Sequence, residues 1–451
     1  MLHPLQSVLL NSDASLLFCV IKNEIKAFRR TNEGYVLCGE WIDDLDKTPL
    51  IKEKVLKEQV RQLSENASKK LKTNEGESVT QQHVVAVTQP KKEAKVPKPG
   101  PGAPPIYHYI RNLGLSRNEK LLIGCTDSDK AAVIFKIDSE DDKNILKLIK
   151  RQPYPKRPNA ITTSMDDSDL ILADKFGDIY SMPIAEEVLS SINDEKAPIL
   201  GHVSMLTDVN MVKDSEGKQY IITADRDEHI RISHYPQSYI VDKWLFGHEE
   251  FVSSICIPTW NDRLLFSAGG DHFVFSWDWK SGKLLHKFDY SELIKNYLTN
   301  DHLAPERFQN EKGDVIEYSV LKIVSIKDEP LIVFLVEATK VLFVLKVDTE
   351  TGVLSLHQSL EFENNIISIT SAPDSKTLGV SLDNRDNQDA DIIKLLFLEN
   401  ETFVEQKNVN KKLSDSIKLA LESDKIANVE REDVYPLYHN ASLRKHGEHF
   451  S

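Results

Sequence analysis

The side chains of this sequence that could perform chemistry are histidines spaced with a hydroxyl and an acid. His248 is followed by Ser267 and Asp271. A histidine held by an acid beside a hydroxyl can activate a nucleophile or act as a general base. However, a glycine stands directly before His248, and Trp277 follows Asp271 by six residues. This order is typical of a β-propeller repeat, in which the hydroxyl links the histidine to the indole N–H. We therefore expect a structural network.

A second copy of the set lies earlier in the chain. Gly201-His202 is followed by Thr223 and Asp227, while Ser233 stands at the position of the tryptophan. We expect Asp227 to orient His202 from a turn, and Thr223 to supply the hydroxyl. Because each trio braces its own blade and the two never meet in one pocket, neither is predicted to be catalytic.

The repeat extends over most of the chain. With the turn residue as a marker, four clear copies are spaced 47, 51 and 44 residues apart, and weaker copies bring the total to seven. The markers are Asn23, Asp129, Phe176, Asp227, Asp271, Thr339 and Asp391. Seven blades of about 43 residues occupy roughly 300 residues, so the remainder must be insertions and a tail. The apolar window from Pro330 to Val347 is interrupted by two charges and predicts two buried strands joined by a turn.

These observations predict an all-β fold, a seven-bladed WD-repeat β-propeller with a charged disordered insertion and a short C-terminal helix and tail. The helix is expected to begin at Ser414 or Asp415, and the tail is expected to dock. The predicted parts are a first blade with a ring-closing strand at 1–47, the insertion at 48–103, the remaining blades at 104–412 with an ordered insertion near 288–314, and the helix and tail at 413–451.

Charge and composition exclude several classes of protein. The chain of 451 residues has a net charge of −14, while the segment 48–103 has 11 basic and 6 acidic residues, which leaves −19 for the rest. A propeller so acidic cannot hold RNA over most of its surface. Glycine-rich nucleotide loops, nucleophile elbows and zinc-ligand spacings are missing, so we expect no enzyme, no cofactor and no metal. Nothing in the sequence is long and apolar enough to predict a membrane span.

A charged cluster marks a candidate docking surface. Arg226 and Arg231 stand among acidic residues, and Lys175 occupies the comparable turn one blade earlier. On spacing alone, such a cluster is typical of a solvated face. The alternative is a polar docking strip across two blades, in which an arginine seeks a carboxylate of another protein. Basic runs at Lys69–Lys72 and Lys91–Lys92 could serve as a nuclear-import signal or as a weak phosphate contact.

Several longer segments carry a resemblance to a known family. They are APPIYHYIRNL (103–113), LADKFGD (172–178), LGHVSMLTDV (200–209), IITADRDEHIRISHYP (221–236), LFGHEEFVSS (245–254), DHLAPERFQNE (301–311) and SLRKHGEHFS (442–451). With them, the chain resembles the non-catalytic WD-repeat subunit of the eukaryotic tRNA guanine-N7 methyltransferase in its fungal form.

The resemblance implies a scaffold that binds a catalytic subunit, which itself holds S-adenosylmethionine and the tRNA and methylates a guanosine of the variable loop. By position, Arg231 matches the family's basic residue that pairs with an acidic side chain of that subunit; Lys175 and Arg226 are included only by proximity. We expect a heterodimer, tRNA bound mainly through the partner, and a nuclear location, with the cytoplasm also compatible. The alternative is a general WD-repeat adaptor, such as a ubiquitin-ligase substrate receptor or a ribosome-assembly factor.

Overall fold

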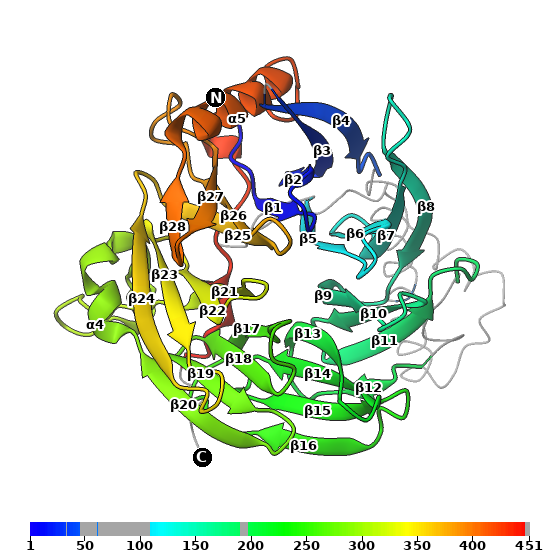
Figure 1. Cartoon of the computed structure of the whole chain (residues 1–451), viewed down its shortest axis with the longest axis vertical. Helices are drawn as coiled ribbons and strands as arrows, with labels where there is room; N and C mark the ends of the chain where they lie inside the picture. Colours follow the sequence, from blue (N-terminus) through cyan, green and yellow to red (C-terminus); the bar gives the residue numbers. More distant parts are fainter. Residues whose placement is uncertain (33, 46–60, 62–108, 190–196, 447–451) are drawn as a thin grey trace, which may run out of the picture. The chain divides into compact units, whose positions relative to one another are not determined.

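The computed structural model describes residues 1–32, 34–45, 61, 109–189 and 197–446. Within the unit formed by Met1–Asp43 and His108–Ser451, seven antiparallel sheets of four strands each stand around a central axis (Figure 1). The first strand of each sheet contacts the first strand of the next and is therefore innermost. The predicted seven-bladed β-propeller is confirmed.

Each blade consists of four strands that follow one another in sequence. Blades 1 and 2 comprise β1 (Ser7–Leu10), β2 (Leu16–Ile21), β3 (Glu24–Thr31), β4 (Gly34–Ile42), β5 (Ile110–Leu115), β6 (Leu121–Thr126), β7 (Ala131–Ile137) and β8 (Leu146–Pro153). Blades 3 and 4 comprise β9 (Pro158–Thr163), β10 (Asp169–Asp174), β11 (Asp178–Pro183), β12 (Leu200–Gly201), β13 (Leu206–Lys213), β14 (Gln219–Asp225), β15 (Ile230–Tyr235) and β16 (Val241–Leu245).

The other three blades follow the same plan. Blade 5 comprises β17 (Val252–Cys256), β18 (Leu264–Gly269), β19 (Phe273–Asp278) and β20 (Lys283–Asp289). Blades 6 and 7 comprise β21 (Val320–Ser325), β22 (Leu331–Val336), β23 (Val341–Val347), β24 (Leu354–Glu361), β25 (Ile366–Ala372), β26 (Thr377–Leu382), β27 (Ile393–Glu399) and β28 (Thr402–Glu405).

The second and third strands of the blades are the most apolar, because neighbouring blades cover both of their faces. Every residue of β22 is buried, and β23 follows it after a short turn, as predicted for the window 330–347. The seven marker residues all lie between the second and third strands of their blades, so the sequence spacing located every blade.

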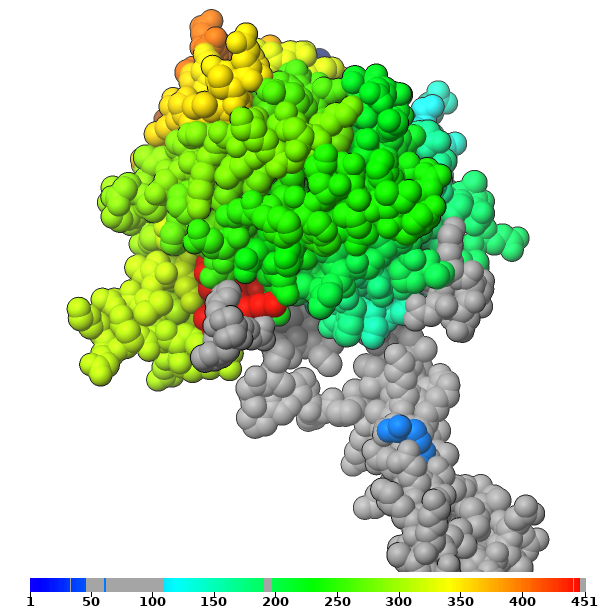
Figure 2. Space-filling view, turned by 90° about the horizontal axis from the view of Figure 1, so that it is seen from below, coloured from blue at the N-terminus to red at the C-terminus, as the bar shows by residue number. Residues whose placement is uncertain are grey.

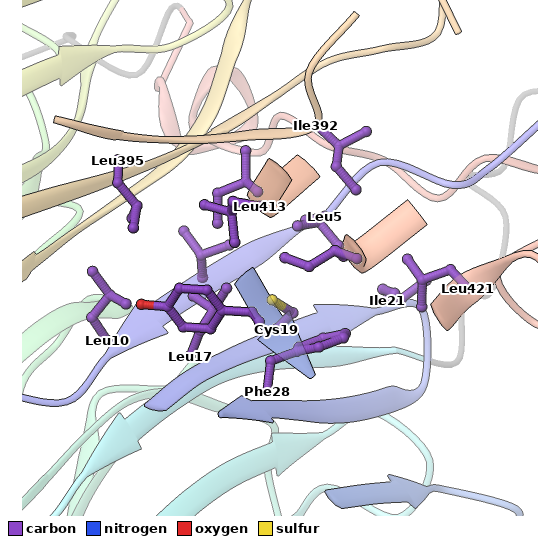
Figure 3. Close-up of a cluster of buried hydrophobic side chains, with 14 of the residues drawn as sticks. Leu5, Leu10, Leu17, Cys19, Ile21, Phe28, Ile392, Leu395, Leu413 and Leu421 are labelled. Carbon is purple, nitrogen blue, oxygen red and sulfur yellow. The ribbon is translucent and has the colours of Figure 1, made fainter. Parts of the chain in front are cut away.

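The ring closes between blades 1 and 7 by packing rather than by a shared sheet. The prediction placed a ring-closing strand within 1–47. In the described residues of this range all four strands form the sheet of blade 1, where β1 pairs with β2. The β1 amides at Val8 and Leu10 donate to the Ser368 and Thr370 hydroxyls of blade 7 at 3.4 and 3.1 Å. Figure 3 shows the apolar side chains of blades 1 and 7 that meet the helix α5 (Lys407–Leu421).

Helix α5 differs from the prediction at its N-terminus. It begins at Lys407 rather than at Ser414 or Asp415, and Gln406 precedes it without a side-chain cap. Ser414 lies buried within the helix, where its hydroxyl accepts a hydrogen bond from the Ile392 amide at 2.9 Å. A serine that satisfies a buried backbone amide is tolerated inside a helix, which is why its usual preference for a cap misled the prediction.

Short helices occupy the loop before blade 6 and the C-terminal segment. The first group is α4 (Ser291–Ile294), η1 (Lys295–Tyr297), η2 (Asn300–His302) and η3 (Glu306–Phe308), and the second is η4 (Arg431–Asp433) and η5 (Asn440–Leu443). We call residues 434–446 the C-terminal strap, which Figure 1 shows in red across the ring. The predicted insertion at 48–103 lies outside the described residues, apart from Arg61.

Candidate functional site

The network of blade 5 joins four side chains in the predicted order. His248 Nδ1 lies 2.8 Å from Asp271 Oδ2, and His248 Nε2 lies 2.7 Å from Ser267 Oγ. The indole N–H of Trp277 donates to the same hydroxyl at 2.8 Å. All four residues are buried, so a substrate cannot reach the serine. The arrangement therefore braces the blade.

The network of blade 4 uses a different acid from the one predicted. His202 Nε2 lies 2.8 Å from Thr223 Oγ1, but its Nδ1 lies 2.8 Å from Asp225 rather than Asp227. Asp225 also accepts the amides of Asp227 and His229 at 2.8 and 3.0 Å, so one carboxylate builds the whole turn. In blade 5 the acid stands four residues after the hydroxyl, and the prediction applied the same spacing to blade 4. In blade 4 the acid that holds the histidine is instead Asp225, the last residue of β14, only two residues after Thr223.

Arg231 is buried in a way that its alternation with Ile230 and Ile232 did not predict. The residue is 8% exposed, and its guanidinium faces blade 3 instead of forming part of a solvated surface. It donates to Ser233 Oγ at 2.9 Å, to the Gly201 carbonyl at 2.9 Å and to the Ser238 carbonyl at 3.3 Å. Burial lowers the pKa of this guanidinium, and no carboxylate of the described residues pairs with it.

Arg231 lies beside one ring of an exposed aromatic surface. The guanidinium carbon lies 5.6 Å from the centre of the Trp244 ring. The centre of the same ring lies 5.5 Å from that of the His229 ring and 6.3 Å from that of the Phe246 ring, on which it is stacked. Phe246 is 67% exposed, and Val203 is fully exposed beside the histidine of the blade network. We call Val203, His229, Trp244 and Phe246 the blade-4 patch. Figure 2 faces the outer side of blades 4 and 5, in green.

The sequence analysis did not identify the blade-4 patch. Trp244 and Phe246 come just before Gly247-His248, at the end of the outermost strand of blade 4. Side chains on an outermost strand have no neighbouring strand beyond them, so large aromatic residues there signal a surface for another molecule. By contrast, Trp277 and Trp279 are both buried.

Arg226 lies in the same turn but contacts the chain's own C-terminus. Its guanidinium donates to the carbonyls of Leu443 and Arg444 at 2.6 and 3.4 Å. Asp227, which the sequence analysis placed in the histidine network, instead accepts from the Ser204 hydroxyl and pairs with Lys445 Nζ at 2.5 Å. Both side chains therefore hold the C-terminal strap in this structure.

Lys175 lies in a separate group of cations on blades 2 and 3. The ammonium groups of Lys156 and Lys175 lie 4.0 and 5.4 Å from the centre of the Phe176 ring, which is 54% exposed. The pKa of Lys175 is lowered, first by burial and then by its cationic neighbours. We call Arg111, Lys156, Arg157 and Lys175 the basic cluster.

The two guanidinium groups of the basic cluster differ in the hydrogen bonding of their Nε atoms. Arg111 Nε donates to Asp127 at 2.8 Å, whereas the buried Nε of Arg157 has no hydrogen-bond partner among the described residues. Burial and the proximity of Arg111 lower the pKa of Arg157. Cations gathered beside an exposed ring are suited to a phosphate backbone, and they form a local exception in a chain with a net charge of −14.

The described residues contain no metal site and no membrane-spanning helix. No group of three or more His, Cys, Asp or Glu side chains in this part of the chain could hold a metal ion. None of the described helices is long and apolar enough to span a membrane. The four cysteines are free.

Two solved structures share the fold of this chain. The structure of U3-55K has a TM-score of 0.54 at 11% identity and covers 84% of this chain and 88% of its own. The WD40 repeats of RRP9 have a TM-score of 0.52 at 12% identity, with 84% and 87% covered. Together with the blade networks, these likenesses define the molecule as a WD40-class β-propeller.

Comparison with protein families narrows the class. The model of the tRNA methyltransferase TRM82 WD40 domain matches residues 17–198 and 189–395. A relative from Kluyveromyces lactis is 76% identical over 451 residues, and one from Saccharomyces cerevisiae strain S288c is 48% identical over 461; each comparison covers 100% of this chain and at least 99% of the relative. Both are named tRNA (guanine-N(7)-)-methyltransferase non-catalytic subunit TRM82. This chain belongs to the TRM82 family and, like these relatives, is non-catalytic.

Proposed function

We propose that this chain binds the catalytic subunit of a tRNA guanine-N7 methyltransferase as a heterodimer, and activates or stabilises it for methylation of a variable-loop guanosine. The names of its relatives support the enzyme class. The observation that carries the docking site is the blade-4 patch, in which the Trp244 ring lies beside a nearly buried arginine and near the exposed ring of Phe246. Tryptophan and arginine are the residues most enriched among binding hot spots.

Arg231 supplies the polar part of this proposed docking site. Its three hydrogen bonds end on neutral oxygens, although a guanidinium has five N–H donors. A carboxylate of the partner that reached this side chain would form a charge pair in a largely desolvated position. Such a pair strongly favours one orientation of two docked proteins, because misplacing it leaves a buried charge unpaired.

The acidic propeller leaves most tRNA binding to the partner. Its charge disfavours phosphate over most of its surface, so we propose that tRNA binds mainly through the catalytic subunit, with the basic cluster as a local contact on this chain. We also propose a nuclear location on the basis of the basic runs at Lys69–Lys72 and Lys91–Lys92, which lie outside the described residues. Replacing these lysines with alanine and imaging the tagged protein tests the location.

Titration of the catalytic subunit with variants of the blade-4 patch tests the docking proposal. We expect Trp244→Ala combined with Phe246→Ala to weaken binding by at least about thirty-fold, corresponding to about 2 kcal/mol for hot-spot residues. Leu419→Ala is the matched control, because Leu419 is 69% exposed on α5. The thermal unfolding midpoint should change little in both variants. Unchanged affinity in the double variant would remove the patch from the interface.

A further inference from the structure

We propose that the C-terminal strap positions the blade-4 patch, so that contacts made by Lys445, Leu443 and Arg444 set the affinity for the partner. This inference rests on the proposed function, since it assigns a role to a segment that supports the blade-4 patch without belonging to it. It concerns the free chain first, because the strap would hold the surface ready before the partner arrives.

The strap is anchored along its length to several blades. The Tyr435 amide donates to His3 Nε2 at 3.1 Å, and the Tyr438 hydroxyl lies 3.2 Å from Asp383 of blade 7. Glu337 of blade 6 accepts the amides of His439 and Asn440. These contacts fix the direction of the segment before it reaches blades 5 and 4.

Arg444 and His446, among the last described residues of the strap, contact acidic side chains. Arg444 pairs with Glu250 of blade 5 at 2.7 Å, and His446 lies 2.8 Å from Glu317 while it stacks on the Phe308 ring at 3.8 Å. In Figure 2 this end of the strap appears in red beside the green surface of blades 4 and 5. The strap therefore arrives at the blade-4 turn already held on its other side.

At blade 4 the strap joins the turn between β14 and β15. The Arg226 guanidinium holds the Leu443 and Arg444 carbonyls, and Lys445 pairs with Asp227. The lysine and aspartate side chains are 24% and 29% exposed, so solvent screens this pair only in part. A backbone contact and a side-chain contact together restrain two consecutive residues of the turn.

The turn contains a residue with a left-handed backbone and leads directly to the patch. Glu228 has a φ of 73°, a left-handed conformation that is unfavourable for a residue with a side chain and persists only when the surroundings enforce it. The centre of the ring of the next residue, His229, lies 5.5 and 6.0 Å from the centres of the Trp244 and Phe246 rings. Release of the strap would thus increase the freedom of the turn and of the ring that it carries.

The expected size of the effect follows from a population shift. If the turn holds the binding conformation for only a tenth of the time without the strap, the apparent affinity falls about ten-fold although no contact with the partner is lost. Because the Lys445–Asp227 pair is partly exposed, we expect roughly five-fold to ten-fold weaker binding when it is reversed in sign.

Two measurements on the full-length chain test the proposal. Lys445→Glu should speed amide hydrogen exchange at residues 226–230 in the free chain and weaken binding of the catalytic subunit by about five-fold to ten-fold. Lys445→Arg, which keeps the charge, should leave both unchanged. Lys327→Glu is the matched control, since it reverses a lysine that pairs with Asp374, away from this turn.

The outcomes separate this inference from the function on which it rests. If Lys445→Glu and Arg226→Ala alter neither exchange nor affinity while the Trp244 and Phe246 variant loses binding, the strap has no positioning role and the docking proposal stands. Weaker binding of Lys445→Glu without faster exchange would make Lys445 a direct contact and overturn the positioning role. If the aromatic variant also binds normally, both proposals fail.

Discussion

Arg231 is a nearly buried cation whose hydrogen-bond acceptors are all uncharged, so the fold and the proposed interface should both be sensitive to reversal of its charge. We predict that Arg231→Glu weakens the heterodimer by about 2–5 kcal/mol, since the new carboxylate would face the partner's acid. Calorimetric titration measures the loss. Arg231→Lys should recover part of it, because the charge remains while the planar set of donors does not.

A structural explanation of the same result has to be excluded, since Arg231 also donates to the carbonyls of Gly201 and Ser238. Circular dichroism and thermal unfolding of each variant supply this control. If Arg231→Glu folds normally and binds with the affinity of the unchanged chain, Arg231 does not lie in the interface.

The two aspartates of the blade-4 turn have separate roles, which substitution can distinguish. Asp225 is 2% exposed, and Asp225→Ala removes the acceptor of the His202 ring and of two turn amides, so we predict a loss of about 1–3 kcal/mol in unfolding free energy. Asp227→Ala loses partly exposed contacts and should cost less than about 1 kcal/mol. Chemical denaturation measures both, and an equal loss in the two variants would contradict the assignment.

At the scale of elements, the contact between the strap and His3 makes the stability of the fold depend on pH. His3 is 1% exposed and accepts the Tyr435 amide, and burial lowers its pKa from 6.5 to about 4. A histidine whose folded pKa is lowered contributes stability that is complete above pH 6.5 and is lost as the pH falls toward 4. We predict that this single group accounts for about 3 kcal/mol over that range.

Comparison with His3→Gln isolates this contribution, because the amide of glutamine can accept the same hydrogen bond without titrating. The unfolding free energy of the unchanged chain should fall more steeply between pH 6.5 and 4 than that of His3→Gln. Parallel pH profiles of the two chains would show that His3 does not couple the strap to pH.

The spacing of the sequence predicted where the blades lie, but not the contacts that form only in the folded chain. The spacing of turn residues such as Asp129 and Asp271 follows from the repeat itself, so all seven blades could be counted. The start of α5 and the acidic partner of His202 could not be predicted from the sequence, because a buried serine and a shifted turn depend on contacts made only after folding. The same holds for Arg226, whose acceptors lie more than two hundred residues away.

At the scale of the whole molecule, an acidic propeller that carries the basic cluster on blades 2 and 3 should contribute to RNA binding through few charges. We predict that Lys156→Glu combined with Lys175→Glu weakens tRNA binding by the assembled heterodimer by less than ten-fold and lowers the slope of log affinity against log salt by about two. Filter binding at several salt concentrations measures this. Lys283→Glu with Lys346→Glu, on blades 5 and 6, is the matched control.

We propose above all that blade 4 presents the surface on which the catalytic subunit docks. Hydrogen exchange of the free chain and of the assembled heterodimer compares every blade in one experiment. We predict that β16 and the turn at 226–229 gain the strongest protection on assembly, while the outer strands of blades 6 and 7 exchange as before. Protection confined to blades 6 and 7, with blade 4 unchanged, would contradict the account.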